Sequence, residues 1–174
     1  MLSAVKHIAD LMIIETLDRL FTSLCDSACI VAVELGQAAE PLWRALGEAG
    51  IARAWVPESH GGSAATLADV CAIARIAGQH AAPVPLADHM LAAHLAACHD
   101  MPIDDGILAL APAPATHDTL SITRGRIDGQ RHRVPFARWA SAILVPIREP
   151  DGEQLALIDP RSVTITQAKS LCGE

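Results

Sequence analysis

The sequence contains few large aromatic side chains. It has no tyrosine, and its only phenylalanines and tryptophans are Phe21, Phe136, Trp43, Trp55 and Trp139. Nevertheless, 51% of the 174 residues are apolar, and most of these are alanine and leucine. A core built from such side chains packs closely with few aromatic anchors. At this length the chain can form one domain, or one complete domain and part of another.

A long apolar run without charges is also absent. The first apolar pattern contains Lys6, His7, Asp10 and Glu15, and these residues interrupt the hydrophobic region that a secretory signal requires. No run of about 18 uncharged apolar residues follows, which is the length that predicts a membrane-spanning helix. We therefore expect a cytoplasmic protein with no membrane span.

A cluster of basic residues is missing as well. The 13 basic and 20 acidic side chains give a formal net charge of -7. A protein that binds nucleic acid needs a basic face to neutralise phosphates, so the composition argues against that class. Five arginines do gather between residues 124 and 138. Two interpretations stay open for them, as exposed hairpin residues or as contacts with an anionic ligand.

The cysteines and histidines form no recognisable ligand set. The five cysteines are odd in number and scattered through alanine-rich segments, which is typical of buried thiols in a reducing compartment. His89, His94 and His99 recur every five residues, so on a helix each is rotated by about 140° from the last. They cannot share one face as an i, i+4 metal pair does. No metal site is predicted.

The first hundred residues show helical patterns. Apolar residues recur at helical spacing from Ile8 to Val33, with a break near residues 25–27. Pro41 and Gly50 frame a second helix. Thr66 and Asp69 have the spacing of a capping box, and the helix that they begin reaches about His80. A further helix is expected from Leu86 to about His99, after the two prolines at positions 83 and 85.

The remainder of the sequence shows strand patterns. Short segments rich in branched residues alternate with Pro, Gly and Asp: "ILALAP", "TLSITRGRIDG", "AILVPI", "QLALID" and "SVTITQ". The pairs Asp128-Gly129 and Asp151-Gly152 are expected at hairpin turns. The predicted fold class is therefore α+β, an all-helical N-terminal domain (residues 1–103) followed by an incomplete antiparallel β-barrel or sandwich domain (residues 104–174).

The loop "VPESHGG" joins two of the predicted helices. Pro57 fixes one turn, and Gly61 and Gly62 permit conformations that other residues avoid. Glu58 can act as a helix cap or loop anchor, or as a catalytic base, and a carboxylate at a helix start is more often a cap. A phosphate cradle lacks the motif that usually accompanies it. We expect a tight connection between helices.

Taken together, these segments resemble the acyl-CoA dehydrogenase family. The run "LWRALGEAGIARAWVPESHGG", the helix that begins at "TLADV" and the proline-interrupted entry at "AGQHAAPVPLADHM" are similar to the N-terminal helical domain of that family. The later "GRIDGQRHRVPFARWASAILVPI" and "DGEQLALID" are similar to its middle β domain. The two blocks occur in the family's order. The first motif is carried by Leu42, Trp43, Leu46, Gly50, Val56, Pro57, Glu58, Gly61 and Gly62.

The resemblance implies a reaction and its partners. Members of the family use FAD to oxidise an acyl-CoA thioester to the enoyl-CoA, with a glutamate as base. They work as oligomers of acyl-CoA dehydrogenase subunits and pass electrons to an electron-transfer flavoprotein. The arginines between residues 124 and 138 would then meet phosphates of CoA or FAD, unless they are exposed hairpin residues.

The chain also departs from the family in two respects. The family's base lies in a C-terminal helical domain that has no counterpart before Glu174, and we expect a divergent, truncated member, or one that a partner completes. No catalytic residue is therefore predicted in this chain. Where the family has hydroxyls and amides that meet the flavin, this chain has "APAPATHDT". Thr116, His117 and Thr119 remain as the predicted cofactor-binding residues.

Three functions follow from the sequence. The first is an acyl-CoA dehydrogenase-like flavoprotein subunit that forms one wall of the acyl-CoA and flavin pocket. The second is a non-catalytic assembly subunit of a heteromeric acyl-CoA dehydrogenase that has lost its own flavin contacts. The third is a helical interaction module unrelated to CoA.

Overall fold

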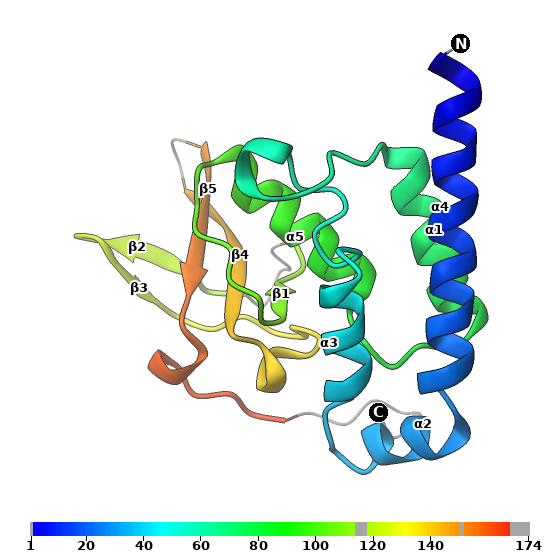
Figure 1. The fold of residues 1–174 in the computed structure, drawn as a ribbon. Coiled ribbons are helices and arrows are strands. Elements are labelled where there is room, and N and C mark those ends of the chain that lie inside the picture. The colour runs from blue at the N-terminus through cyan, green and yellow to red at the C-terminus, as the bar shows by residue number, and fades with distance from the viewer. Residues whose placement is uncertain (1, 114–117, 150–151, 168–174) are drawn as a thin grey trace. The chain divides into compact units, whose positions relative to one another are not determined.

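The computed structural model of the chain describes residues 2–113, 118–149 and 152–167 (Figure 1). Helices come first and strands second, as the sequence predicts. The helices are α1 (Leu2–Leu24), α2 (Ser27–Glu34), α3 (Glu40–Glu48), α4 (Leu67–Gln79) and α5 (Leu86–Cys98). The strands are β1 (Leu108–Leu110), β2 (Ser121–Thr123), β3 (Arg126–Asp128), β4 (Ala142–Glu149) and β5 (Gly152–Ile158). The α+β class is confirmed.

The chain divides into two compact units. The helical unit comprises residues 1–94 and the strand unit residues 95–174, so the division falls within α5. The domain boundary between residues 103 and 104 was drawn from the change of sequence character alone, and it stays a prediction.

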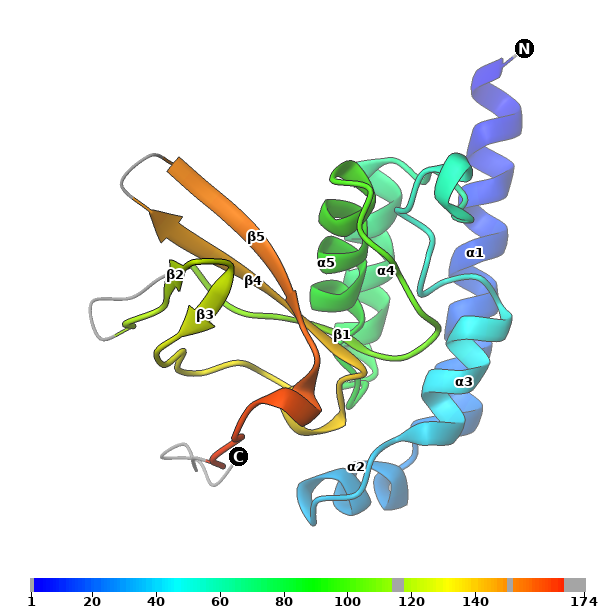
Figure 2. The ribbon, with the colours of Figure 1, turned by 90° about the vertical axis from the view of Figure 1, so that its left-hand side faces the viewer.

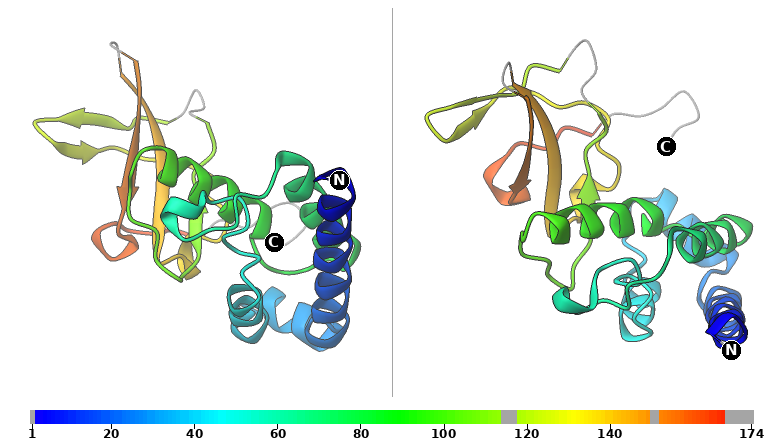
Figure 3. Two further views of the ribbon diagram at one scale, coloured as in Figure 1. Left: turned by 45° about the horizontal axis from the view of Figure 1, so that its top comes forward. Right: turned by 90° about the horizontal axis from the view of Figure 1, so that it is seen from above.

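In the helical unit, α1 packs against α3 and α4 (Figure 3). The side chains of Leu17 and Phe21 on α1 are fully buried. The break after α1 lies where the sequence predicts it, at Cys25 and Asp26. There the carboxylate of Asp26 accepts a hydrogen bond of 2.8 Å from the amide of Cys29 and begins α2, because an aspartate satisfies an amide that the first turn of a helix leaves free.

The start of α4 is the predicted capping box. The Thr66 hydroxyl accepts from the Asp69 amide at 3.4 Å, and the Asp69 carboxylate accepts from the Thr66 amide at 2.7 Å. At the other end, the His80 ring lies 2.9 Å from the Asp18 carboxylate of α1 and 5.6 Å from the Phe21 ring. Both ends of α4 are thus fixed by specific contacts.

The strand unit contains a three-stranded sheet of order β1-β4-β5. β4 and β5 form a long antiparallel pair, from Ile143 opposite Ile158 to Glu149 opposite Gly152. β1 pairs with β4 in parallel, so the sheet is mixed and not wholly antiparallel as predicted. The reason is topological, since the chain leaves β1 and passes through the β2–β3 hairpin before β4 brings it back along β1 in the same direction. No closed barrel is formed by the residues that the structure describes.

The β2–β3 hairpin turns at a different place from the one predicted. Its two central residues are Arg124 and Gly125, with φ of 53° and 75°, and Thr123 pairs with Arg126. Asp128 instead pairs with Ser121 at the open end of the hairpin, so the turn expected at Asp128-Gly129 is wrong. Both central residues need positive φ in this turn, and an arginine adopts it here because the register is fixed elsewhere.

Burial of one face of the hairpin fixes that register. The hairpin lies beside β4 (Figure 2). Ile122 and Ile127 are opposite each other, and both pack against a buried cluster that includes Ile143, Val145 and Ile147 of β4. A shift by one residue would turn both isoleucines to solvent. At the second predicted turn, Glu149 pairs with Gly152, and Asp151 lies outside the described residues.

The predicted strand "SVTITQ" is not formed. Pro160–Ser162 is a short 3-10 helix, and residues 163–167 are irregular and exposed. Val163 and Ile165 have exposed fractions of 44% and 41%. Alternation predicts a strand only where another strand pairs with it, and none does among the residues that the structure describes.

Candidate functional site

Of the three predicted cofactor residues, the structure describes one. Thr116 and His117 lie outside the described residues. Thr119 lies before β2 and is exposed. Its amide donates to the Gln130 carbonyl at 3.1 Å, and its hydroxyl accepts from the Gln130 amide at 3.2 Å. These bonds place Thr119 opposite Gln130 at the open end of the hairpin.

Gly129 allows the backbone before Gln130 to pass close to the Thr119 carbonyl group. A Cβ atom added at Gly129 would lie 2.3 Å from the Thr119 carbonyl oxygen, and its φ is 124°. Only glycine combines that backbone conformation with that contact. The glycine that the sequence analysis assigned to a turn is therefore required for the pairing of Thr119 with Gln130.

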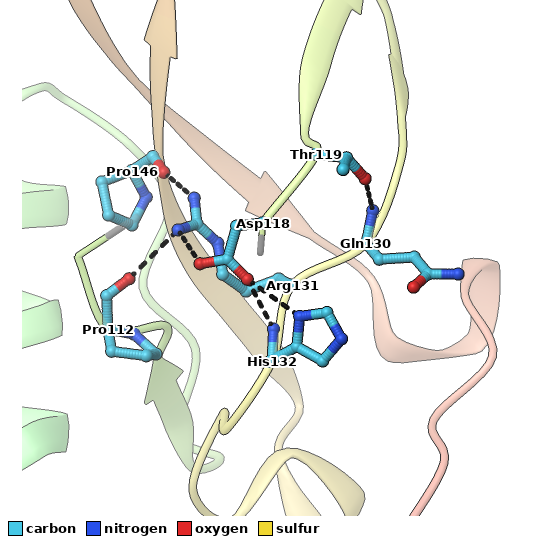
Figure 4. A network of polar contacts seen from close by, with 7 residues as sticks. All are labelled: Pro112, Asp118, Thr119, Gln130, Arg131, His132 and Pro146. Carbon is cyan, nitrogen blue, oxygen red and sulfur yellow. Dashed lines mark hydrogen bonds and ion pairs between the residues drawn. The ribbon is translucent and has the colours of Figure 1, made fainter. Parts of the chain in front are cut away.

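Asp118 and Arg131, which are next to Thr119 and Gln130 in the chain, form a buried ion pair (Figure 4). The Nη1 atom of Arg131 lies 3.2 Å from Oδ2 of Asp118, and their side chains are only 6% and 3% exposed. The other carboxylate oxygen of Asp118 accepts from the His132 amide at 3.0 Å and lies 3.1 Å from Nδ1 of the same residue. One carboxylate thus joins the two consecutive residues Arg131 and His132.

The Arg131 guanidinium also replaces a strand at the edge of β4 (Figure 4). β1 covers that edge as far as Leu144, whose carbonyl accepts from the Ala111 amide at 2.9 Å. The Pro146 carbonyl, two residues on, lies on the same edge and accepts from Nη2 of Arg131. Nη1 donates to the Pro112 carbonyl at 3.4 Å. Arg131 therefore satisfies the backbone where β1 ends.

The energetics of the pair point to a role in geometry. Removing one partner of a buried ion pair costs about 3–5 kcal/mol, but an apolar replacement of the whole pair is often neutral. In addition, Nε of Arg131 is buried and has no acceptor among the described residues. In some proteins such buried pairs serve to define the arrangement of the backbone more than to raise the free energy of unfolding.

The loop "VPESHGG" forms the connection that the sequence predicts. The amides of His60, Gly61 and Gly62 donate to the carbonyls of Pro57 and Glu58 at 2.9 to 3.1 Å, so they are not directed at a phosphate. A Cβ atom added at Gly62 would lie 2.0 Å from the Val56 carbonyl oxygen, which explains the second glycine. The Glu58 side chain is exposed in a 3-10 turn, an environment that favours an anchor over a base.

Two of the three histidines weighed as metal ligands contact tryptophans instead. His89 is 2% exposed and meets the edge of Trp43 at 4.7 Å between ring centroids. The His94 ring stacks on Trp55 at 4.5 Å, and its Nδ1 lies 3.1 Å from the Trp55 carbonyl oxygen. Across residues 2–113, 118–149 and 152–167, no three His, Cys, Asp or Glu side chains are grouped to hold a metal ion.

A second aromatic cluster lies in the strand unit. The guanidinium of Arg138 lies 3.9 Å from the centre of the Trp139 ring, and Phe136 lies 5.6 Å from that ring. Phe136 has a φ of 55°, an unusual value for a bulky side chain. The arginine covers the tryptophan face, so Trp139 presents no open stacking platform on that face.

Sequence patterns missed Asp118, and they offered Arg131 only as an exposed hairpin residue or as a contact with an anionic ligand. The segment "RHR" offers Arg131 and Arg133 in alternate positions, which a strand would turn to the same side. Arg133 is exposed, with a φ of 55°, and the side chain of Arg131 is buried. The positive φ of Arg133 interrupts the alternation expected for a strand, and the residue types do not predict it. A counter-charge such as Asp118, in the segment that leads into the opposite strand of the hairpin, is the one signal that could have identified the buried arginine.

Within the part of the chain that the structure describes, no helix is long and apolar enough to cross a membrane. No family model matches the sequence, and no curated protein matches it.

Two solved structures resemble the chain. One is described as a Tcur3481-Tcur3483 steroid acyl-CoA dehydrogenase variant, with a TM-score of 0.76 and 26% identity over 88% of this chain. The other is the ChsE4-ChsE5 complex from Mycobacterium tuberculosis, with a TM-score of 0.67 and 21% identity over 87% of this chain. The second likeness shows the fold alone. This chain spans about half the length of each, 48% and 47% respectively.

Proposed function

This chain resembles the acyl-CoA dehydrogenase family over most of its length, and from that resemblance we propose that it forms part of an FAD-dependent acyl-CoA dehydrogenase. The proposed reaction is removal of hydrogen from the α and β carbons of an acyl-CoA thioester to give the enoyl-CoA. The chain contributes one wall of the acyl-CoA and flavin pocket, and further polypeptide contributes the rest. The observation that carries the proposal is the structural match of 88% of the chain to a steroid acyl-CoA dehydrogenase.

The described residues offer a limited fit to FAD. A threonine hydroxyl has one proton to donate and two lone pairs. The Thr119 hydroxyl uses one lone pair for the Gln130 amide, so its proton can still be donated to a flavin oxygen or nitrogen. In this proposal Thr119 holds the flavin, together with Thr116 and His117, which lie outside the described residues. A bound flavin would supply the hydride acceptor.

The base belongs to other polypeptide in this proposal. A base must be desolvated enough to hold its proton near neutral pH, and the exposed Glu58 does not meet that requirement. The partners proposed are an acyl-CoA substrate, other acyl-CoA dehydrogenase subunits and an electron-transfer flavoprotein. Both similar structures carry paired names, Tcur3481-Tcur3483 and ChsE4-ChsE5, and the second is described as a complex.

We keep a cytoplasmic location as part of the proposal. The cysteines that the structure describes, Cys25, Cys29, Cys71 and Cys98, form no disulfides. Such dispersed free thiols are typical of a reducing compartment.

A non-catalytic assembly subunit is the second candidate, because backbone amides that might meet a flavin are already used. The Ala111 amide donates to the Leu144 carbonyl, and the Thr119 amide donates to the Gln130 carbonyl. In the segment that corresponds to the family's flavin contacts, residues 111–115 are only alanine and proline. A subunit with so few donors would complete a partner without holding FAD itself.

Purification tests the two candidates. If the chain holds flavin, the purified protein shows a visible flavin spectrum, and FAD at 100 times its Kd raises the free energy of unfolding by about 2.7 kcal/mol. With a longer acyl-CoA dehydrogenase subunit it should then form enoyl-CoA. A colourless protein that co-purifies with such a subunit supports the assembly candidate. A protein that shows neither behaviour, with no stabilisation by FAD or acyl-CoA, overturns both.

A further inference from the structure

We propose that Arg131 is a positioning residue, which holds the backbone around Thr119 in the arrangement needed for its contact with the cofactor. The inference rests on the proposed function, because it gives Thr119 its role there. Arg131 itself is buried and is not proposed to touch the cofactor.

The Arg131 guanidinium joins three separate segments of the strand unit. It donates to the Pro112 carbonyl after β1, to the Asp118 carboxylate before β2 and to the Pro146 carbonyl within β4. Pro112 and Asp118 are described residues on either side of residues 114–117. Arg131 therefore fixes both the point where the chain leaves the sheet and the point where it returns to the hairpin.

Arg131 is connected to Thr119 through Asp118 and Gln130. Asp118, which precedes Thr119, is held by Nη1 of Arg131 and by the His132 amide. Gln130, which precedes Arg131, pairs with Thr119 through two hydrogen bonds. Thr119 thus lies in a short ladder in which residues 118 and 119 face residues 130–132. Its exposed hydroxyl is fixed by this ladder and not by packing of its own side chain.

The contacts at position 131 require an arginine and not a lysine. A guanidinium is planar and has five N–H donors in a rigid fork, whereas a lysine ammonium is a compact point charge on a flexible stem. The acceptors around Arg131 belong to three backbone segments, and a lysine cannot reach all of them at once. Lysine keeps the charge opposite Asp118, so Arg131→Lys separates the geometric role from the electrostatic one.

The experiment compares Arg131→Lys and Asp118→Asn with wild type, and uses Arg161→Lys as the matched control. Arg161 lies in the same unit, outside the arginines of residues 124–138, and its side chain is 90% exposed, with Asp159 2.8 Å away. For each protein we would measure the free energy of unfolding, the Kd for FAD by flavin fluorescence, and hydrogen exchange of the Thr119 and His132 amides. In wild type, both amides should exchange more slowly than exposed amides of residues 163–167.

In Arg131→Lys and in Asp118→Asn, we expect exchange at Thr119 and His132 to be about tenfold faster and the Kd for FAD to rise by about tenfold or more. The Val145 amide, in the core of β4, should be unaffected. Arg161→Lys should change neither the exchange rates nor the Kd for FAD. If either variant fails to fold, the other variant and the wild-type exchange data still decide whether Arg131 holds the backbone around Thr119.

Two outcomes would overturn the inference while leaving the proposed function intact. One is a variant that is less stable but binds FAD with the wild-type Kd, since that is a purely structural role. The other is unprotected Thr119 and His132 amides in wild type. If wild-type protein does not bind FAD at all, the flavin role of Thr119 fails with the proposed function, and exchange still decides whether Arg131 holds the backbone.

Discussion

Two glycines, Gly62 and Gly47, have opposite effects on stability because of their positions in the fold. Gly62 lies in the "VPESHGG" loop, where an added Cβ atom would meet the backbone oxygen of Val56 at 2.0 Å. Gly47 lies in α3, where an added Cβ atom would have no neighbour within 4 Å. The first glycine is required by a close approach of backbone to backbone. The second is a helical glycine whose conformational freedom only disfavours folding.

We predict opposite effects of alanine at these positions. Gly62→Ala forces the loop apart and should lower the free energy of unfolding by about 1–3 kcal/mol. Gly47→Ala should raise it by about 0.5–1 kcal/mol, because alanine is the better helix former. Urea unfolding followed by circular dichroism measures both. An unchanged Gly62→Ala would show that the loop can relax without cost.

The cysteines differ in exposure and in the local environment of their thiols. Burial, the neighbouring Cys29 and the Asp26 carboxylate raise the pKa of the Cys25 thiol, which also donates to the His80 carbonyl at 3.3 Å. Burial and Asp26 raise the pKa of Cys29. The thiolate is the reactive form, so a raised pKa leaves less of it at a given pH. Cys71 is exposed on α4.

We therefore predict that iodoacetamide at about pH 8 labels Cys71 before Cys25 and Cys29. As the pH rises, the labelling rate of Cys25 and Cys29 should continue to increase beyond the pH at which an ordinary thiol levels off. Mass spectrometry of peptides from timed reactions measures the order. Protein unfolded in urea is the control, and there the three rates should converge. Equal rates in the folded protein would contradict the prediction.

At the scale of elements, the ends of the helices follow from local residue types, whereas the pairing of the strands does not. The capping box at Thr66, the Asp26 cap and the start of α5 after Pro83 and Pro85 all lie within a few residues of the helix ends that they set. Such signals are visible in sequence because they act over one turn. The register of the β2–β3 hairpin depends on packing against a cluster that includes distant residues of β4, and "SVTITQ" has no partner strand among the described residues, which explains why these two predictions are wrong.

The capping box provides the prediction at this scale. Thr66→Ala removes the side chain that accepts from the Asp69 amide and donates to its carboxylate at 2.6 Å. We expect the free energy of unfolding to fall by about 1 kcal/mol. Thr66→Ser keeps the hydroxyl and should lose much less. Thermal unfolding of the two variants measures the difference, and equal losses would mean that the methyl group of Thr66 and not its hydroxyl is important.

At the scale of the whole molecule, the two units have their own buried side chains. Leu46 of α3 and Leu144 of β4 are both fully buried. Trp43 and Trp55 belong to the helical unit and Trp139 to the strand unit. The tryptophans can therefore report on the two units separately, once Trp139 is replaced by phenylalanine.

In a Trp139→Phe background, Leu46→Ala should lower the free energy of unfolding reported by tryptophan fluorescence by about 2–5 kcal/mol, the cost of a cavity in a core. Leu144→Ala should change that fluorescence transition less and should mainly alter the circular dichroism of the strands. Equal shifts of the fluorescence transition in both variants would show that the two units unfold as one.

The sequence by itself determined the class of the molecule, the order of helices and strands, the ends of α4 and α5 and the family resemblance. These features depend on residue periodicity, caps and short motifs, each of which acts between neighbours in the chain. The tertiary structure alone decided that β1 runs parallel to β4, that the hairpin turns at Arg124 and Gly125, and that Arg131 is buried against Asp118 and Pro146. The physical reason is that a strand edge, a register and a buried charge are satisfied only by residues far away in sequence, which residue types alone do not identify.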